Sequence, residues 1–427
     1  MKVLAIALLF VAVYAKHEEY AGYKSYFVGQ KNQAQQHALQ SLENEFQLDF
    51  LGRVTSSQET LVLVKPEFQA AFTKSLKAFG LSYRVHADDV VKALQNDDRI
   101  IEEVVQEKAR NGGARIPYDN YQPLSVYDAY LDDIARRYPN VVTLVSPANS
   151  FEGRPIKYLK ISTTNFQDTS KPVIFIDGGI HSREWISPPT VTWAIRKLVE
   201  DVTEPDLLER FDWILLPIVN PDGYEHSYTS NRFWRKTRSA TSIALCRGVD
   251  GNRNYDFAWN TVGTSTNPCS DTYGGPTAFS EIETRVVRDI LHENLSRMAL
   301  YLTMHSFGSM ILYPWGHDGS LSNNAFALQT VGVAMADEIF THSLPNFPRY
   351  SVGNSLLTIG YGASGASEDY AHSIGVPLSY TYELPGLNAG MNGFILDPRF
   401  IEQVCRETWA GIVVGARRAG DLFVPHP

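Results

Sequence analysis

Residues 174–185 read IFIDGGIHSREW, and this stretch predicts how the chain around it folds. A short apolar run rich in β-branched residues is typical of a buried strand, which the pair Gly178-Gly179 is expected to end. His181 and Glu184 follow that break, three residues apart. A turn after the strand can bring both side chains to one point at the edge of a sheet. We interpret them as two ligands of a metal ion whose third ligand lies elsewhere in the chain.

The composition excludes nucleic acid and membranes as partners. The chain has 427 residues, of which 44% are hydrophobic, and its formal net charge is −9. An acidic chain has no electrostatic footprint for nucleic acid or for an anionic membrane surface. After the N-terminal apolar run, no segment has the ~18 consecutive apolar residues that span a bilayer. The length predicts two or three globular domains.

The first 15 residues, MKVLAIALLFVAVYA, combine one early Lys, an apolar run and a small-residue end. This is the build of a secretory signal peptide, and we expect cleavage after Ala15. The protein is therefore expected to be secreted. A buried N-terminal helix is the alternative, which the polar residues directly after the run disfavour.

Three cysteines remain for this oxidising compartment. Cys246 and Cys269 flank a loop rich in Gly, Asn and Thr. A disulfide between them would close a loop of about 23 residues and contribute about 3 kcal/mol of stability. Cys405 lies in a predicted helix, where a buried and inert thiol is expected.

The N-terminal part of the chain predicts a small α+β domain. Strand, helix, strand, strand, helix and strand are expected in that order, at residues 25–28, 32–45, 46–51, 60–64, 66–79 and 81–85. This order is that of a ferredoxin-like open sandwich. A long, charged, amphipathic helix is expected to follow, at residues 87–109.

That helix is expected to stop at RNGGAR, residues 110–115. A Gly-Gly pair between Arg110 and Arg115 is expected to be exposed and open to a trypsin-like protease. We therefore divide the chain into a signal peptide (1–15), an activation propeptide (16–115) and a second domain (116–427). A plain interdomain linker is the alternative interpretation of this segment.

From residue 116 onward, predicted strands and helices alternate. The strands are expected at 141–145, 156–161, 173–176, 213–217, 298–304 and 377–382, and the helices at 124–137, 188–202, 280–294, 326–341 and 399–418. This alternation predicts an α/β domain with a largely parallel, buried sheet. In such folds ligands bind at the carboxyl ends of strands.

A second histidine lies where a strand is expected to end. His305 follows the predicted strand 298–304 directly and is the natural third ligand. A catalytic zinc takes three protein ligands and keeps a fourth position open for water. HxxE alone is common by chance, so a surface His and Glu are the alternative. The other downstream histidines in polar loops or helix ends are expected to be solvated: His226, His317, His342 and His372.

Six blocks, in this order, resemble the secreted metallocarboxypeptidases typified by pancreatic carboxypeptidases A and B. They are HSREWI (181–186), NRFWRKTR (231–238), GVDGNRN (248–254), HS (305–306), YGASG (361–365) and TYEL (381–384). The resemblance covers nearly the whole chain. It implies a catalytic α/β/α sandwich with a mixed, largely parallel sheet, preceded by a ferredoxin-like propeptide.

The resemblance implies a zinc hydrolase. His181, Glu184 and His305 match the ligands of one Zn²⁺ per chain. Asp250 matches the carboxylate that orients a ligand histidine from behind. Such enzymes hydrolyse the C-terminal peptide bond and release one residue at a time.

The resemblance also implies the groups that act on the substrate. Glu383 matches the general base, which takes a proton from the attacking water. Arg235 matches the group that stabilises the oxyanion. The residues that match the holders of the substrate's terminal carboxylate are Asn252, Arg253 and Tyr361, and an Arg fork suits a carboxylate better than Lys would.

Arg183 and Phe394 match positions that line the outer substrate subsites, and Cys246 with Cys269 matches the family's disulfide. One position departs from the pattern. Phe307, two residues after a metal ligand, stands where members commonly have Tyr. A hydroxyl near an outer subsite is therefore expected to be absent.

Glu368 aligns with the position that sets the preferred C-terminal residue. In the family, an apolar residue there accompanies aromatic or aliphatic preference, and Asp accompanies Lys or Arg. A carboxylate at the bottom of a closed pocket is costly unless a cation pairs with it. We therefore predict a preference for C-terminal Lys or Arg, with the aromatic or aliphatic preference as the alternative. Two other arrangements are open: Glu368 turned outward, or Asp369 buried in its place.

Together these features predict a secreted zymogen whose propeptide covers the active-site cleft until a trypsin-like protease cleaves at Arg110 or Arg115. The resemblance also implies a digestive role in the gut lumen, a monomer, and proteinaceous carboxypeptidase inhibitors as partners besides peptide C-termini. One alternative is a catalytically silent homologue that only binds peptides, which the complete set of matching residues disfavours. Another is a role of the N-terminal domain that does not depend on cleavage.

Overall fold

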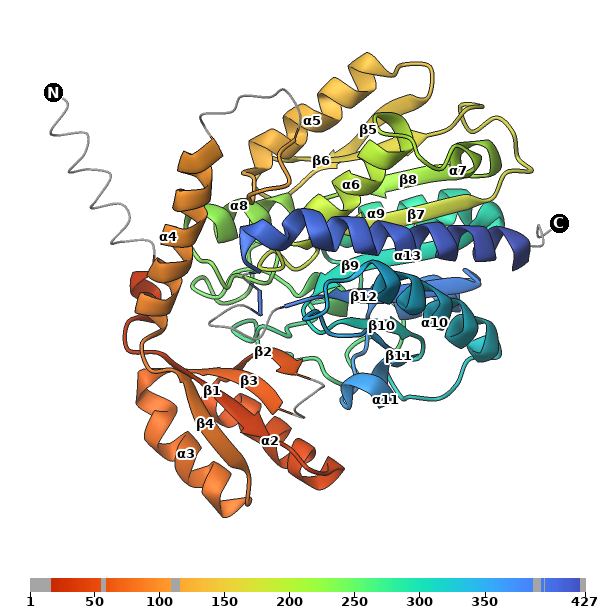
Figure 1. Ribbon diagram of the computed structural model, residues 1–427. Helices are drawn as coiled ribbons and strands as arrows, with labels where there is room; N and C mark the ends of the chain where they lie inside the picture. Colours follow the sequence, from red (N-terminus) through yellow and green to blue (C-terminus); the bar gives the residue numbers. More distant parts are fainter. Residues whose placement is uncertain (1–16, 55–58, 109–115, 387–392, 395, 423–427) are drawn as a thin grey trace, which may run out of the picture.

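The computed structural model describes residues 17–54, 59–108, 116–386, 393–394 and 396–422 (Figure 1). The predicted signal peptide and the predicted cleavage sites at Arg110 and Arg115 lie outside these ranges. None of the helices within them has both the length and the hydropathy of a membrane span.

The N-terminal domain is the predicted ferredoxin-like sandwich. Its elements are β1 (Lys24–Gly29), α2 (Gln33–Phe46), β2 (Asp49–Val54), β3 (Glu59–Val64), α3 (Gln69–Ala78) and β4 (Ser82–Ala87). The antiparallel strands lie in the order β2-β3-β1-β4. One predicted boundary was wrong, because α2 continues to Phe46 and Gln47 then adopts a left-handed backbone with φ of 48°, which delays β2 to Asp49.

Helix α4 (Val90–Lys108) leaves this domain and runs along the side of the second domain (Figure 1). It begins three residues later than predicted, because β4 continues to Ala87. The helix therefore forms a continuous arm between the small domain and the start of the large one.

The second domain is built on one sheet of eight strands in the order β11-β10-β12-β9-β7-β8-β6-β5. The strands are β5 (Val142–Asn149), β6 (Pro155–Ile161), β7 (Val173–Gly178), β8 (Asp212–Leu216), β9 (Met298–Ser306), β10 (Met310–Tyr313), β11 (Ser351–Asn354) and β12 (Leu378–Leu384). The four central strands β12, β9, β7 and β8 are parallel, and antiparallel pairs occur toward both edges. The sheet is therefore mixed and parallel at its centre, as predicted.

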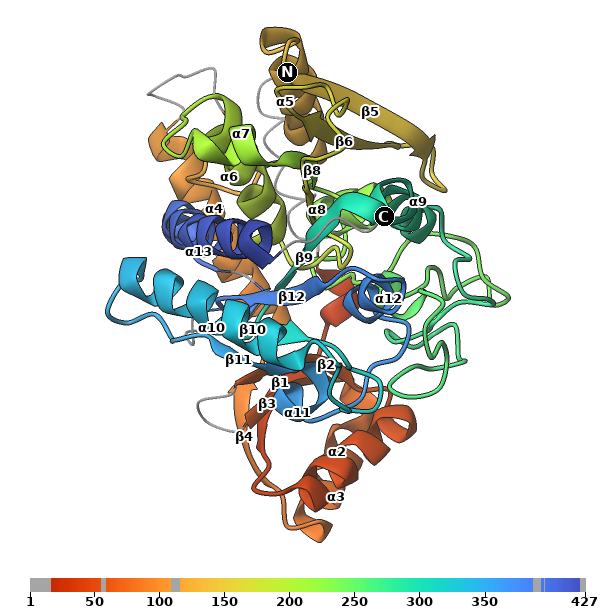
Figure 2. The ribbon, with the colours of Figure 1, turned by 90° about the vertical axis from the view of Figure 1, so that its right-hand side faces the viewer.

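Helices cover both faces of this sheet. Figure 2 shows α6 (Ser187–Val199), α10 (Ala325–His342) and α13 (Ile401–Leu422) on one side, and α9 (Ile282–Asn294) and α12 (Ser367–Ser373) on the other. Alternate residues of each strand enter two separate apolar cores, so that Ile174 and Ile176 face one and Phe175 faces the other. This is the α/β/α sandwich that the alternation of elements predicted.

Several short elements were not predicted. They are the four-residue strands β10 and β11 and the helices α7 (Asp206–Arg210), α8 (Pro221–Thr229), α11 (Ser355–Ile359) and α12. Each has too few residues to show a hydrophobic period, and pairing with neighbouring strands or packing on the sheet stabilises them instead.

The two domains meet through an apolar cluster. Leu51, Leu61 and Leu63 of the small sheet and Leu94 of α4 pack against Phe233, Phe307 and Phe394 of the large domain. Gly52 lies directly on the Phe307 ring, because a Cβ atom at Gly52 would be 2.7 Å from Phe307 Cζ. A side chain at this position of β2 would push the two domains apart.

The cysteines are arranged as predicted. Cys246 and Cys269 form a disulfide, with their Cα atoms 4.7 Å apart. Cys405 is a free thiol buried in α13, and burial raises the pKa of this thiol. The disulfide restrains the long segment between α8 and α9, which carries several of the candidate site residues.

Candidate metal centre and substrate cleft

The turn after β7 begins with a glycine. Gly179 has a φ of 68°, in the left-handed region that favours glycine. The Gly178 and Gly179 carbonyls accept the backbone N–H groups of Val219 and Asn220, which hold the turn against the segment after β8. This turn places His181 and Glu184 at the carboxyl end of β7.

Three side chains from two strand ends form a compact donor cluster. Nδ1 of His181 lies 2.9 Å from Oε1 of Glu184 and 3.1 Å from Nδ1 of His305. The exposed fractions are 4% for His181, 3% for Glu184 and 1% for His305. The structure therefore brings together the three predicted ligands.

The cluster fits a zinc ion by its chemistry. One ligand atom from each residue lies within 4.8 Å of the other two. Two imidazoles and one carboxylate are a known ligand set of catalytic zinc, which leaves a position open. Such a cluster of buried polar atoms is costly without a shared partner, and a cation supplies one.

Asp250 supports this cluster from behind. Its Oδ1 accepts a hydrogen bond from His181 Nε2 at 2.9 Å, which directs Nδ1 of that ring toward the other donors. Its Oδ2 accepts from Nε and Nη2 of Arg235 at 3.0 and 2.9 Å. Although burial opposes ionisation, Arg235 and His181 hold the pKa of Asp250 well below its usual value. The carboxylate therefore stays charged and orients both groups.

Glu383 lies beside the cluster because of strand register. In the parallel pair of β9 and β12, Glu383 is directly opposite His305, so both side chains lie on one face of the sheet. Burial and the neighbouring Glu184 carboxylate raise the pKa of Glu383 to about 8. A carboxyl group with a raised pKa at such a place is suited to exchanging protons near neutral pH.

A second set of groups faces the same cleft. Arg253 donates Nε to the Gly263 carbonyl at 2.9 Å and Nη1 to the Asn252 carbonyl at 2.8 Å, so that two backbone acceptors fix its plane. The side-chain oxygen of Asn252 accepts the backbone N–H of Ser367 at 2.8 Å, which turns its NH₂ group away from that contact. Both residues line the cleft together with Tyr361 and the metal cluster. The structure thus brings together the three residues expected to hold a carboxylate.

Glu368 lines the same cleft and is 5% exposed. Several small or apolar residues line the cleft as well: Leu312, Gly316, Ser355, Ile359, Ala363, Ala366 and Thr381. Burial and the adjacent Asp369 raise the pKa of Glu368 to about 7. Within the described chain, Oε1 of Glu368 accepts a long hydrogen bond from the Ser355 hydroxyl at 3.5 Å, and Oε2 has no hydrogen-bond partner. A buried carboxyl group with one unpartnered oxygen is suited to receiving a cation.

Of the two arrangements left open for Glu368, the outward one is not observed. Asp369 is also fully buried, but both its oxygens accept the backbone N–H of Gly316 at 2.9 Å, and Oδ2 accepts that of His317 at 3.2 Å. Asp369 therefore shapes the loop that borders the pocket, while Glu368 lines the pocket itself.

The N-terminal domain closes the outer part of the cleft. Phe50, Leu51 and Gly52 of β2 line the same cleft as the metal cluster. Nη1 of Arg183 donates to both carboxylate oxygens of Asp49 at 2.9 and 3.0 Å, and its Nη2 donates to the Phe50 carbonyl at 3.3 Å. The Arg183 guanidinium also lies 4.6 Å from the centre of the Phe394 ring. Both expected outer-subsite residues are thus covered by the small domain.

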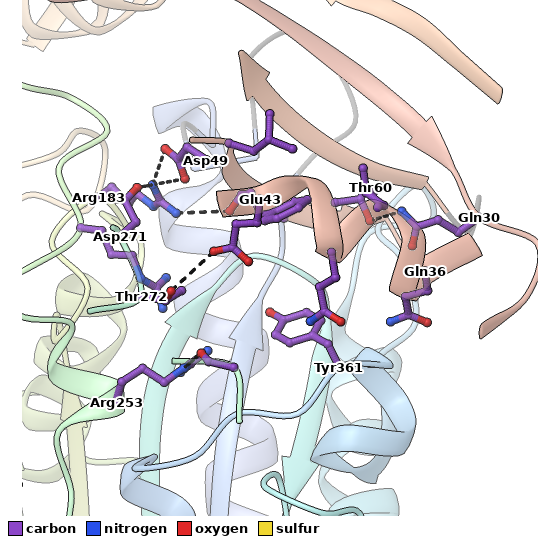
Figure 3. A pocket seen from close by; sticks show the side chains of 17 residues that line it. Gln30, Gln36, Glu43, Asp49, Thr60, Arg183, Arg253, Asp271, Thr272 and Tyr361 are labelled. Carbon is purple, nitrogen blue, oxygen red and sulfur yellow. Dashed lines mark hydrogen bonds and ion pairs between the residues drawn. The ribbon is translucent and has the colours of Figure 1, made fainter. Parts of the chain in front are cut away.

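An open pocket remains beside this contact, lined by residues of both domains. Figure 3 shows Gln36, Glu43 and Asp49 of the small domain facing the large domain across it. The facing residues of the large domain include Arg183, Arg253, Asp271, Thr272 and Tyr361. The small domain therefore lies over the site without filling it.

Two contacts of this interface could not be found from the sequence. These contacts involve Asp49 and Asp271. Oδ2 of Asp271 lies 3.6 Å from Arg183 Nη1. Both are isolated acidic residues in segments without a recognisable motif. Their place beside Arg183 arises only from domain docking. The histidines set aside as solvated lie outside the metal cluster, as expected, but His226, His317 and His372 are half-buried, and only His342 is exposed.

Comparison with known proteins identifies similar chains. The profile of the family described as zinc carboxypeptidase matches residues 127–411, and that described as carboxypeptidase activation peptide matches residues 26–97. A carboxypeptidase B of Helicoverpa zea is 66% identical over 99% of this chain and 100% of its own.

Solved structures agree with this result. The carboxypeptidase A of Helicoverpa armigera is 43% identical, with a TM-score of 0.90 over 94% of this chain and 98% of its own. Bovine thrombin-activatable fibrinolysis inhibitor, in complex with tick carboxypeptidase inhibitor, is 30% identical, with a TM-score of 0.65 over 72% of this chain and 99% of its own.

Replacing Asp250 with Asn should weaken zinc binding. The variant keeps the shape but loses the charge that orients His181, and an affinity loss of about 10- to 100-fold is expected. Competition with a chromogenic chelator measures it. Asp212→Asn is the matched control, because Asp212 is also fully buried and paired with Arg297, far from the cluster. Equal zinc affinity in Asp250→Asn and the wild type would contradict the assigned orientation.

Docking of the N-terminal domain should weaken as the pH rises from about 4 to about 7. Burial, with Asp271 nearby, raises the pKa of Asp49 to about 7 although Arg183 opposes the shift. The docked state therefore holds a proton that an undocked, solvated Asp releases near pH 4. To test this, the protein is cleaved between the domains and run on gel filtration at pH 5 and at pH 8. The fraction of the small domain that stays bound to the large domain is measured at each pH.

In that experiment Asp49→Asn should reduce the pH dependence. Asp97 of α4, whose pKa burial also raises to about 7, should account for a further part. Asp88→Asn should keep the pH dependence, because Asp88 is an exposed carboxylate of the same domain that pairs with Lys24. Stronger retention at pH 8 than at pH 5 in the wild type would contradict the argument.

Proposed function

The chain belongs to the zinc carboxypeptidase family and is the zymogen of a zinc-dependent enzyme, and we propose that this enzyme prefers to remove C-terminal Lys or Arg. The observation that carries the proposal is the buried carboxyl group of Glu368 in the wall of the cleft, where Oε2 has no hydrogen-bond partner in the described chain. The preference for aromatic or aliphatic residues is the alternative.

His181, Glu184 and His305 hold the zinc ion in this proposal. When bound, zinc supplies Lewis-acid polarisation of the scissile carbonyl and lowers the pKa of a coordinated water. Asp250 keeps the His181 ring turned so that Nδ1 faces Glu184 and His305, the two residues that would hold the ion with it.

Glu383 serves as the general base and then as the general acid. It takes a proton from the attacking water and delivers it to the nitrogen of the leaving residue, so that one group completes both transfers. Without the ion, burial and the Glu184 carboxylate raise the pKa of Glu383 to about 8, and a cation held by the neighbouring ligands would lower it again toward the range of a general base.

Arg235 and the carboxylate-binding groups position the substrate. Arg235 lies 3.9 Å from Glu184 at the edge of the metal cluster and stabilises the negative charge that develops on the carbonyl oxygen. Asn252, Arg253 and Tyr361 hold the terminal carboxylate, which restricts cleavage to the last peptide bond. Because Arg253 is pre-oriented by two backbone carbonyls, little conformational entropy is lost on binding.

The pocket argument favours a basic C-terminal residue. A Lys or Arg side chain that enters the pocket would pair with Glu368 and remove the cost of burying its charge. An aromatic side chain would leave that carboxylate unpaired or force it to stay protonated. The name of the Helicoverpa zea relative supports the basic preference, and that of the Helicoverpa armigera relative supports the alternative.

The organisation of the zymogen is part of the proposal. We assign residues 1–15 to a signal peptide, 16–115 to the propeptide and 116–427 to the catalytic domain, with activation by a trypsin-like protease at Arg110 or Arg115. A secreted monomer that acts in the gut lumen is the setting we propose. The complex of the bovine relative with tick carboxypeptidase inhibitor supports protein inhibitors of this kind as partners.

Replacing Glu383 with Gln should leave zinc bound and lower kcat/KM by about 100- to 10,000-fold, because the variant cannot accept a proton. Zinc content and peptide hydrolysis after trypsin treatment are the two measurements. Glu283→Gln is a matched control, since burial raises the pKa of Glu283, in α9, to about 8 as well. Full activity of Glu383→Gln would refute the assigned base.

The pocket is tested with peptides that differ only in a C-terminal Arg, Phe or Glu. We expect the highest kcat/KM for Arg, and Glu368→Gln should reduce the preference for Arg over Phe by about tenfold or more. Glu368→Asp keeps the charge and should retain most of the preference. A wild-type preference for Phe would establish the alternative.

A further inference from the structure

Arg232 is a buried cation outside the residues assigned above. Its exposed fraction is 1%, and its guanidinium lies 3.6 Å from the centre of the Trp185 ring. Removing a guanidinium from water costs several kcal/mol unless hydrogen bonds and nearby charges compensate. An Arg in this position therefore needs specific partners.

Two backbone carbonyls are those partners. Nη1 of Arg232 donates to the Arg183 carbonyl and Nη2 donates to the Phe394 carbonyl, each at 2.7 Å. The side chains of Arg183 and Phe394 stack on each other at 4.6 Å. The planar Arg232 guanidinium thus binds the backbone of both Arg183 and Phe394, whose side chains stack on each other. The single ammonium group of a Lys lacks this two-pronged geometry.

The joined segments are far apart in sequence. Arg183 lies in the turn after β7, between two metal ligands, and Phe394 lies after β12. The segment that carries Arg232 already holds the β7 turn, because Ser182 donates its N–H to the Arg235 carbonyl and its hydroxyl to the Trp234 carbonyl. Arg232 adds the Phe394 segment to this assembly.

The charge of Arg232 is compensated in part by the N-terminal domain. Within the described chain, Arg232 forms no ion pair at 4.0 Å or less, but the buried Asp97 of α4 interacts with it electrostatically. Proteolytic removal of the propeptide would take Asp97 away. The two carbonyls and the Trp185 face would then be what holds the guanidinium in place.

We propose that Arg232 is a positioning residue that holds Arg183 and Phe394 together as one wall of the outer substrate subsites. This wall would contact the residues of a peptide upstream of the cleaved bond. The inference rests on the proposed subsite roles of Arg183 and Phe394. It predicts that Arg232 matters for long peptides and little for the shortest ones.

The test compares a blocked dipeptide with a blocked tetrapeptide that ends in the same two residues, using trypsin-activated full-length protein. The wild type should cleave the tetrapeptide with the higher kcat/KM. Arg232→Met, which keeps the volume and the contact with Trp185, should lose this advantage by about tenfold through KM. Its kcat on the dipeptide should stay within about threefold, with zinc content unchanged. Arg232→Lys should be intermediate.

Arg238→Met is the matched control. Arg238 also lies over a tryptophan, 4.4 Å from the centre of the Trp234 ring, but pairs with Glu152 instead of the subsite carbonyls. This variant should keep the wild-type advantage for the tetrapeptide.

Three results would overturn the inference: an unchanged advantage in Arg232→Met, an equal loss of kcat on both substrates, or loss of zinc. If Arg232→Met does not fold, an unchanged advantage in Arg232→Lys overturns it instead. A wild type with no advantage for the tetrapeptide would contradict the subsite roles of Arg183 and Phe394 themselves.

Discussion

The parallel pairing of β7, β9 and β12 is the constraint on which the site depends. Because the three strands run the same way, their carboxyl ends meet at one edge of the sheet. The register then places Glu383 opposite His305, and the glycine turn after β7 brings His181 and Glu184 to the same point. Helices on both faces bury the strands, so this edge cannot shift without disturbing two apolar cores.

Buried charges are arranged in linked pairs around that edge. Asp250 joins His181 to Arg235, so a single carboxylate orients both a member of the metal cluster and a neighbouring guanidinium. The N-terminal domain uses the same device when Asp49 covers Arg183. The Arg183 guanidinium thus has a carboxyl group of the N-terminal domain as its partner. Apolar packing of Leu51 and Gly52 on Phe307 accompanies this polar contact.

Much of the fold could be predicted from local patterns. Strands of about five or more residues and helices of about ten or more show a hydrophobic period, and the order of these elements indicated both domains. The residues of the metal cluster, with Asp250, Arg235 and Glu383, could be predicted to lie together because they belong to sequence blocks that resemble a known family. Short elements such as β10 and α11 were missed, since four or five residues carry no clear period. Asp49 and Asp271 were missed because nothing local marks an interdomain contact.

The sequence by itself determined the residue types and the strands that carry them: two histidines and two glutamates, each at or after the end of an apolar run. Only the tertiary structure decided which of the neighbouring acids, Glu368 or Asp369, lines the cleft. The helix α12 sends their side chains in different directions, and the loop amides of Gly316 and His317 engage Asp369. The direction of a side chain depends on packing between segments distant in sequence, which no local pattern contains.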